Sequence, residues 1–278
     1  MSEIKDYSNL FSLKGKTAVV TGGSRGLGLH AATGLLLAGC TTVIITSRKV
    51  DACEQAVQSL KALHPRASIS AIPADLSKPS EVERFAKELS AATGGKIDIL
   101  IANAGASWGA PFDSYPDSAF AKVMDLNVRS VFNLIRLTTP MLEKAAKERG
   151  GDGMSRVITV GSVAGIVIGT TGDMGTYGYA ASKAAVLHMT KHLAIELGPR
   201  RILVNAIAPG FFPSKMADGL IKLAGGEDKM AQTNPTGRLG KAEDIVGAVV
   251  WLCSNASSHI NGAIIPIDGG KHLGTGKL

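Results

Sequence analysis

Short apolar runs of strand length alternate along this chain with longer segments of helical periodicity. The runs are rich in Val and Ile and mostly lack polar alternation, which is typical of parallel strands buried on both faces. They lie at residues 17–21, 42–46, 68–72, 98–102, 156–160, 203–207 and 263–267. The helical segments lie at residues 26–38, 51–64, 80–92, 117–149, 177–198, 214–224 and 243–254. In the longest of these helices, Pro140 is the predicted point of interruption.

Strand–helix alternation throughout predicts an α/β protein with a single-domain, Rossmann-type, doubly wound parallel sheet. A length of 278 residues suits one domain with a large core or two small domains. No linker, repeat or low-complexity block divides the chain. We expect a polar N-terminal arm at residues 1–14, the domain at 15–270 and a flexible C-terminal tail at 271–278.

Composition limits the classes of partner. The formal net charge is +7, but Lys and Arg are scattered, so nucleic-acid binding is not expected. The basic balance suits either a solvated surface or attraction of an anionic cofactor or substrate. Three cysteines without paired spacing argue against disulfides and zinc. With no signal pattern or apolar run of membrane-spanning length, we expect a cytoplasmic protein, although an organelle stays open.

A glycine-rich loop follows the first predicted strand and opens the first predicted helix. Glycines allow a tight turn and let backbone amides approach a pyrophosphate, while the helix N-terminus adds a positive dipole end. The spacing is Gly-x-x-x-Gly-x-Gly, unlike the general Gly-x-Gly-x-x-Gly fingerprint. The loop predicts a dinucleotide site formed by Gly22, Ser24, Arg25, Gly26, Leu27 and Gly28.

The residues after the second predicted strand indicate which dinucleotide binds. An NAD site usually has Asp or Glu there, to bind the ribose 2′-hydroxyl. This chain has Ser47 and Arg48, and a hydroxyl with a planar cation suits a 2′-phosphate. We predict NADP(H), bound through Ser47, Arg48 and Arg25. In the alternative, Arg48 is merely solvated and Asp51 takes the acidic role, but Asp51 lies too far along and is expected to cap the next helix.

Tyr179 and Lys183 lie four residues apart, on one face of a predicted helix. A phenol ordinarily titrates at about pH 10, and a nearby ammonium lowers its pKa. We therefore predict Tyr179 as the proton donor to a carbonyl, activated by Lys183. Together with the glycine loop and Ser162, this pattern resembles the short-chain dehydrogenase/reductase family over nearly the whole chain.

The resemblance implies roles for further residues. Ser162 would donate a hydrogen bond to the substrate oxygen, and Asn127 would hold a water chain from Lys183 to solvent. Lys183 and Tyr179 would also contact the cofactor. Other segments that match cofactor-binding motifs of the family are Asp75-Leu76, Asn103-Ala104-Gly105, and Pro209-Gly210 with Phe212 and Ser214.

Two segments would surround the substrate. The 17 positions from Ser162 to Tyr179 exceed what is typical of the family, which predicts an enlarged flexible loop at 166–176. Residues 215–236 match the family's substrate lid. No metal site is expected, because His188 and His192 lack a third ligand.

The segments Gly-Ser-Val-Ala-Gly at 161–165 and Ile-Pro-Ile-Asp-Gly-Gly at 265–270 resemble 3-oxoacyl-carrier-protein reductases, particularly the rhamnolipid-type branch. The resemblance implies NADP(H)-dependent reduction of a small-molecule ketone, by a homotetramer or homodimer. The same residues would serve a secondary-alcohol dehydrogenase. A non-catalytic dinucleotide sensor is the third alternative, although a sensor has no need of a proton relay.

Overall fold

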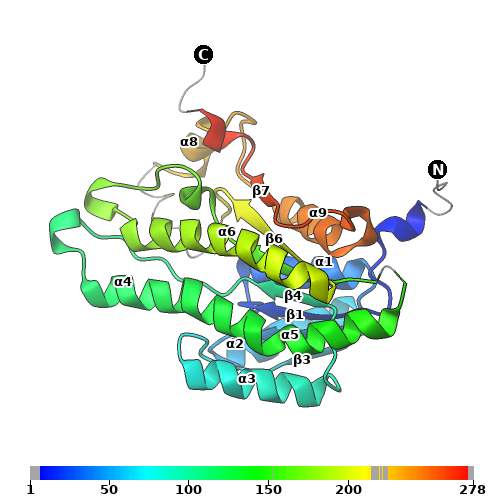
Figure 1. Ribbon diagram of the computed structural model, residues 1–278. Helices are drawn as coiled ribbons and strands as arrows, with labels where there is room; N and C mark the ends of the chain where they lie inside the picture. The colour runs from blue at the N-terminus through cyan, green and yellow to red at the C-terminus, as the bar shows by residue number, and fades with distance from the viewer. Residues whose placement is uncertain (1–6, 152, 214–218, 220, 222–224, 275–278) are drawn as a thin grey trace.

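Seven parallel strands form one sheet in the order β3-β2-β1-β4-β5-β6-β7, with helices on both faces (Figure 1). The structure is a computed structural model that describes residues 7–151, 153–213, 219, 221 and 225–274. The strands are β1 (Thr17–Thr21), β2 (Thr42–Thr46), β3 (Ser68–Ala71), β4 (Ile99–Ala102), β5 (Ser155–Val160), β6 (Ile202–Pro209) and β7 (Ile264–Ile267). The predicted single-domain, doubly wound sheet is confirmed.

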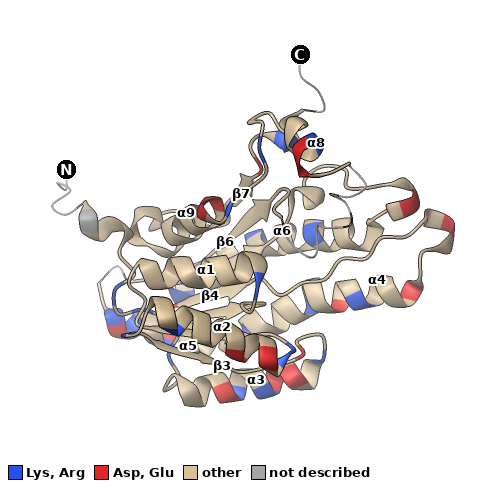
Figure 2. Cartoon of the chain, turned by 180° about the vertical axis from the view of Figure 1, so that it is seen from behind, with Lys and Arg blue, Asp and Glu red and all other residues tan. Residues whose placement is uncertain are grey.

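Helices cover each face of the sheet and produce two cores. On one face, α1 (Gly26–Leu37), α2 (Val50–Leu63) and α9 (Ala242–Cys253) pack together (Figure 2). On the other lie α3 (Pro79–Ala92), α5 (Ser130–Arg149) and α6 (Tyr177–Leu197). Successive residues of β1 serve both cores, since Ala18 and Val20 face the first and Val19 the second. Burial on both faces explains why the strand sequences lack polar alternation.

The long helix predicted at 117–149 is interrupted, but not at Pro140. Between α4 (Asp117–Met124) and α5 lies one turn of π-helix, Asp125–Arg129. Helix α5 continues through Pro140, because Pro140 and Arg136 are both exposed. Water can therefore replace the hydrogen bond that Pro140 cannot donate to the carbonyl of Arg136.

Other element ends differ from the predictions by one or two residues. Helix α2 starts at Val50 after Lys49, so Asp51 lies in its first turn and is not its cap, contrary to the prediction. A short helix that was not predicted, α8 (Glu227–Gln232), lies within the expected lid segment. The predicted helix at 214–224 lies almost wholly outside the described residues.

Parts of the predicted N-terminal arm and C-terminal tail lie within the described residues. Ser8–Phe11 forms a 3-10 turn, and Leu13 is fully buried in the core. Lys271–Leu273 forms another 3-10 turn after β7. None of the described helices combines the length and apolarity that a membrane span requires.

Candidate active site

A cleft of about 840 Å³ opens at the carboxyl edge of the sheet, where the segments after β1, β2, β4, β5 and β6 converge. Open α/β sheets bind ligands at this edge. The predicted residues that line the cleft are Gly22, Ser24, Arg25, Gly26, Leu27, Ser47, Arg48, Leu76, Asn103, Ala104, Gly105, Ser162, Tyr179, Lys183, Pro209, Gly210 and Phe212. Gly28, Asp75 and Asn127 do not line it, and Ser214 lies outside the described residues.

The glycine loop needs its glycines for two reasons. Gly22 and Gly26 have φ angles of 65° and 55°, which strain any residue with a Cβ atom. At Gly28, an added Cβ would overlap the Gly22 carbonyl oxygen and lie 2.5 Å from Asn103 Nδ2. The loop is thus packed closely from behind, while its amide-bearing side and the N-terminus of α1 border the cleft. This arrangement fits a bound pyrophosphate.

Asn103 fixes the end of β4 to the end of β1. Its backbone nitrogen and that of Ala104 both donate to Thr21 Oγ1 at 2.9 Å, and its Nδ2 donates to the Thr21 carbonyl at 2.8 Å. These bonds bring Gly105 to the cleft wall. At Gly105 a Cβ would lie 3.2 Å from the amide oxygen of Asn127, which is closer than most such contacts, so a larger residue would press on Asn127.

The charges around the cleft favour an anionic ligand. Among the described residues that line it, none is Asp or Glu, and the Lys and Arg residues are Arg25, Arg48, Lys183 and Lys271. Arg48 and Ser47 lie directly after β2, at the position where an NAD site has its acid. The donors present therefore fit a dinucleotide with an additional phosphate.

Asp75 holds a turn and does not face the cleft. Its Oδ1 accepts from the Ser77 backbone nitrogen at 3.2 Å and from Ser77 Oγ at 2.8 Å. Leu76, beside it, does line the cleft. The adenine contact implied for Asp75 by resemblance stays a prediction.

Ser162, Tyr179 and Lys183 lie together in the part of the cleft formed by the segment after β5 and by α6, away from Arg48. Ser162 lies two residues after the end of β5, and its Oγ donates to the Pro209 carbonyl at 3.4 Å. Tyr179 and Lys183 lie in the first two turns of α6. Lys183 Nζ is 5.5 Å from the centroid of the Tyr179 ring and donates to the Val160 carbonyl at 2.7 Å. The helical spacing thus places the phenol and the amine at the same wall.

Burial dominates the acid–base properties of Tyr179 and Lys183 in the protein alone. It raises the pKa of the Tyr179 phenol, and a hydrogen bond with Ser162 acts in the opposite direction. Burial also lowers the pKa of Lys183 to about 8, and the amine is bound to the Val160 carbonyl. The activation of Tyr179 by Lys183 stays a prediction.

Asn127 lies in the π-helical turn between α4 and α5, behind the cleft wall. Its Oδ1 accepts from the Ala106 nitrogen at 2.8 Å, and its Nδ2 donates to the Ala106 carbonyl and to Ser182 Oγ, both at 2.9 Å. The side chain is almost wholly buried. Turns of π-helix occur frequently at functional sites.

Comparison with known proteins agrees with this geometry. The family described as Enoyl-(Acyl carrier protein) reductase matches residues 22–272. A protein named short-chain dehydrogenase/reductase PhomF, from Diaporthe leptostromiformis, is 32% identical over 287 residues, covering 95% of this chain and 94% of its own. The chain belongs to the short-chain dehydrogenases/reductases.

A protein and a solved structure from Pseudomonas aeruginosa match this short-chain dehydrogenase/reductase at higher identity. The rhamnolipids biosynthesis 3-oxoacyl-[acyl-carrier-protein] reductase of Pseudomonas aeruginosa is 42% identical over 263 residues, which is 95% of this chain and 98% of its own. A solved structure, the Pseudomonas aeruginosa RhlG/NADP active-site complex, superposes with a TM-score of 0.87 at 41% identity, covering 95% of this chain and 99% of that one.

Several residues of the cleft were not predicted from the sequence, among them three with ionisable side chains, His30, Lys271 and His272. His30 lines the cleft one turn after Gly26 on α1, and helical spacing could have indicated it. Lys271 and His272 also line the cleft, although the sequence placed them in a tail. Only the pairing of β7 with β6 brings them there, and no local pattern reports it.

The enlarged loop at 166–176 does border the cleft, through residues 167–170 and 176. It is attached to the segment after β4, since the Ala110 nitrogen donates to the Gly175 carbonyl at 3.2 Å. The rings of Phe112 and Tyr177 also meet edge to face, 5.6 Å between centroids. The loop thus forms part of the wall on the side of Tyr179.

Proposed function

We propose that this chain is an NADP(H)-dependent ketoreductase that reduces a ketone to a secondary alcohol, with Tyr179 as the proton donor. The observation that carries the proposal is that Ser162, Tyr179 and Lys183 line the same cleft as the glycine loop. The NADP complex in the matching structure supports the cofactor, and the 3-oxoacyl reductase name of the matching protein supports the type of carbonyl.

Each residue has a separate task in this proposal. The reduced nicotinamide, when bound, supplies a hydride to the carbonyl carbon. Ser162 Oγ donates a hydrogen bond that orients and polarises the carbonyl oxygen. Tyr179 gives that oxygen a proton, and Lys183 stabilises the phenolate that remains. Asn127 holds the route by which a proton returns to Tyr179.

The direct test is NADPH consumption with a panel of ketones, β-keto esters and acyl thioesters, with NADH beside it. Turnover with NADPH and little with NADH supports the proposal. A strong preference for NADH contradicts the 2′-phosphate assignment. Alcohol oxidation with NADP⁺ tests the reverse direction, for which the same residues would serve.

Tyr179→Phe tests the proton donor. The variant should lose about 10²–10⁴-fold in kcat, because general acid catalysis contributes that much. NADPH binding, followed by fluorescence, should change less than about twofold, because no phosphate contact is removed. Tyr177→Phe is the matched control, since the Tyr177 ring packs against Phe112 and Tyr115 and does not line the cleft. A fully active Tyr179→Phe variant would mean a different donor or a non-catalytic dinucleotide sensor.

We also propose a homotetramer or homodimer. Large apolar side chains on α4, α5 and α6 support this, namely Phe120, Phe132 and Ile195, which are 39%, 45% and 81% exposed. Light scattering after size exclusion decides the assembly, and a monomer at micromolar concentration would contradict it.

A further inference from the structure

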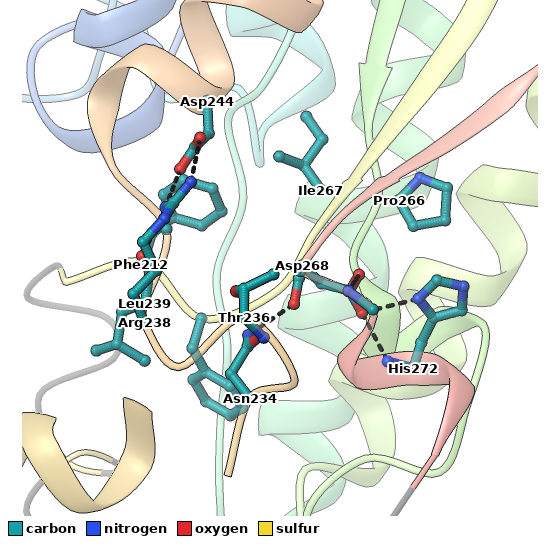
Figure 3. Close-up of a pocket in the computed structure, with 14 residues that line it drawn as sticks. Phe212, Asn234, Thr236, Arg238, Leu239, Asp244, Pro266, Ile267, Asp268 and His272 are labelled. Atoms are coloured by element: carbon teal, nitrogen blue, oxygen red, sulfur yellow. Dashed lines mark hydrogen bonds and ion pairs between the residues drawn. The ribbon is translucent and has the colours of Figure 1, made fainter. Parts of the chain in front are cut away.

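His272 is held rigidly by a buried carboxylate. Asp268 Oδ2 accepts from the His272 backbone nitrogen at 2.7 Å and from its Nδ1 at 2.8 Å, as Figure 3 shows. Asp268 Oδ1 accepts from the Gly270 nitrogen at 3.0 Å. The Asp268 side chain is only 3% exposed and that of His272 is 18% exposed. The Nδ1 edge of the imidazole is therefore fixed by Asp268.

The pair lies at the catalytic end of the cleft. Pro209 pairs with Ile267 across β6 and β7, so Gly210 lies level with Asp268. A Cβ added at Gly210 would be 2.6 Å from Asp268 Cβ. Pro209 also accepts the hydrogen bond from Ser162. His272 is thus connected to Ser162 through adjoining residues, whereas Arg48 follows β2, near the opposite edge of the sheet.

The remaining ring edge is available to a ligand. His272 lines the main cleft and also a second cavity of about 460 Å³, which shares Phe211 and Phe212 with the cleft (Figure 3). Among the described residues, none forms a hydrogen bond with His272 Nε2. Phe211, Phe212 and Pro213 give the cleft apolar surface, and Asn234, Thr236, Arg238 and Asp244 give the second cavity polar groups. A few polar groups among apolar walls are a common way to fix the orientation of a ligand.

The Asp268 carboxylate also determines which hydrogen-bonding roles are left for His272 Nε2. Because Asp268 Oδ2 is an acceptor, Nδ1 carries a proton. A neutral ring then presents Nε2 as an acceptor, and a protonated ring presents it as a donor. Lys271, also at the cleft, is a cation on this side. An oxygen acceptor on the substrate suits Lys271 and the ring in its protonated form.

We propose that His272, positioned by Asp268, is a substrate-recognition residue that donates a hydrogen bond to a second oxygen of the substrate. The substrate class is a ketone with an additional ester, thioester or carboxylate oxygen. The inference rests on the proposed ketoreductase function, which it extends from the reacting carbonyl to a specificity subsite.

The test compares a ketone that has one oxygen with a keto ester. His272→Leu should raise KM for ethyl 3-oxobutanoate about tenfold, the effect of one lost hydrogen bond. The kcat for this ester and the KM for 2-pentanone should stay within about twofold, because the reacting carbonyl is bound elsewhere. His272→Gln, which keeps a donor, should recover part of the loss. His188→Leu, which alters an exposed histidine on α6, is the matched control.

A binding measurement keeps the inference separate from turnover. Ethyl 3-oxobutanoate is titrated calorimetrically into the protein saturated with NADP⁺. Tenfold weaker binding to His272→Leu, but not to His188→Leu, supports the subsite even if turnover fails and the proposed function with it. Equal binding by both variants, or no binding by the unaltered protein, overturns it. A raised NADPH dissociation constant, or an equal rise in KM for ester and ketone, also overturns it and assigns His272 to the cofactor or to the fold.

Discussion

Arg48 is the single residue on which the cofactor assignment chiefly depends. It follows β2, lines the cleft and has no acidic neighbour among the cleft residues described. The adjacent Lys49 carries the same charge but does not line the cleft. Substitutions of Arg48 and of Lys49 can therefore be compared, to distinguish a specific phosphate contact from a general effect of positive charge.

Arg48→Glu should raise the dissociation constant for NADPH about 10–100-fold, the loss expected for a hydrogen bond to a charged group. NADH binding should change less than about threefold, because NADH lacks the 2′-phosphate. Lys49→Glu should affect both cofactors equally and weakly. Fluorescence titrations with each cofactor measure these constants. Equal losses of NADPH and NADH in Arg48→Glu would show that no 2′-phosphate is bound there.

Lys183 makes folding stability depend on pH. Burial lowers its pKa from 10.5 to about 8 in the folded chain. Between these values the unfolded chain holds the additional proton, so the contribution of Lys183 to the free energy of unfolding rises with pH. From pH 8 to pH 10, the unaltered protein should gain about 2 kcal/mol relative to Lys183→Met. Urea unfolding at both pH values measures this.

The comparison with Lys183→Met is needed because other groups act in the opposite direction. Burial raises the pKa of Cys40 and Cys253 to about 12, so their thiols lower stability once the unfolded chain ionises above about pH 9. These contributions are common to both proteins and cancel in the difference. A stability difference that stays constant with pH would contradict the buried, weakly basic Lys183.

Among the elements, α1 and its glycine loop are fixed by close backbone contacts. Gly28 has no space for a Cβ, whereas Gly247, on the exposed side of α9, has nothing within 4 Å of one. The two glycines, both helical, therefore respond oppositely to the same substitution.

Gly28→Ala should lower the free energy of unfolding by about 1–3 kcal/mol, the usual cost of overpacking, and should weaken NADPH binding. Gly247→Ala should raise the free energy of unfolding by about 0.5–1 kcal/mol, because alanine favours the helix. Thermal unfolding measures both. A Gly28→Ala variant with unchanged stability would mean that the loop can shift away from Asn103.

Elements of the fold were predictable where local sequence determines them. Most of the central strands are largely apolar because both faces are buried, and Tyr179 and Lys183 share a wall because helical spacing is local. The π-helical turn that holds Asn127 has no such signature, because its bonds to Ala106 and Ser182 join distant segments. His272 depends likewise on pairing between β6 and β7. The pKa of Tyr179 depends on burial, which helical spacing does not report.

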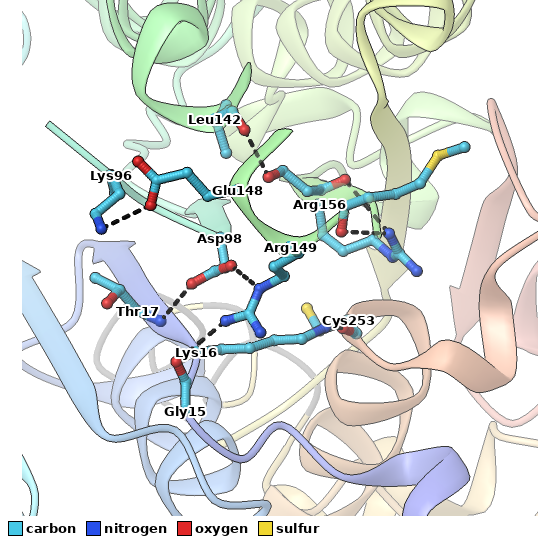
Figure 4. Close-up of polar contacts among 12 residues, drawn as sticks. Gly15, Lys16, Thr17, Lys96, Asp98, Leu142, Glu148, Arg149, Arg156 and Cys253 are labelled. Carbon is cyan, nitrogen blue, oxygen red and sulfur yellow. Dashed lines mark hydrogen bonds and ion pairs between the residues drawn. The ribbon is translucent and has the colours of Figure 1, made fainter. Parts of the chain in front are cut away.

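At the scale of the whole molecule, the edge of the sheet opposite the cleft contains a buried cluster of charges (Figure 4). Asp98 accepts from the Thr17 nitrogen at 2.8 Å and pairs with Arg149. Lys16 and Arg156 lie nearby, both buried, and each donates to a backbone carbonyl. Burial, followed by the charge of Arg156, lowers the pKa of Lys16. Asp98 thus offsets several cations.

Asp98→Ala should lower the free energy of unfolding by about 3–5 kcal/mol, because it leaves buried cations uncompensated. Glu148→Ala removes an ion pair of the same region, Lys96–Glu148, whose side chains are 46% and 49% exposed. This control should cost less than about 1 kcal/mol. Urea unfolding compares the variants. Similar losses in both would show that the Asp98 pair behaves as a surface ion pair.

The strand order also has a consequence for how the protein is made. Strand β1 is synthesised first yet lies inside the sheet, between β2 and β4. Because domains begin to fold from the N-terminus during synthesis, β1, β2 and β3 can pair while β4 to β7 are still untranslated. The nascent chain would then contain a partial sheet of β1, β2 and β3, with the glycine loop and Arg48 at the carboxyl ends of its strands. The edge of β1 that later pairs with β4 would still be open. Ser162, Tyr179 and Lys183 would then be added to a nucleotide-binding surface that had already formed.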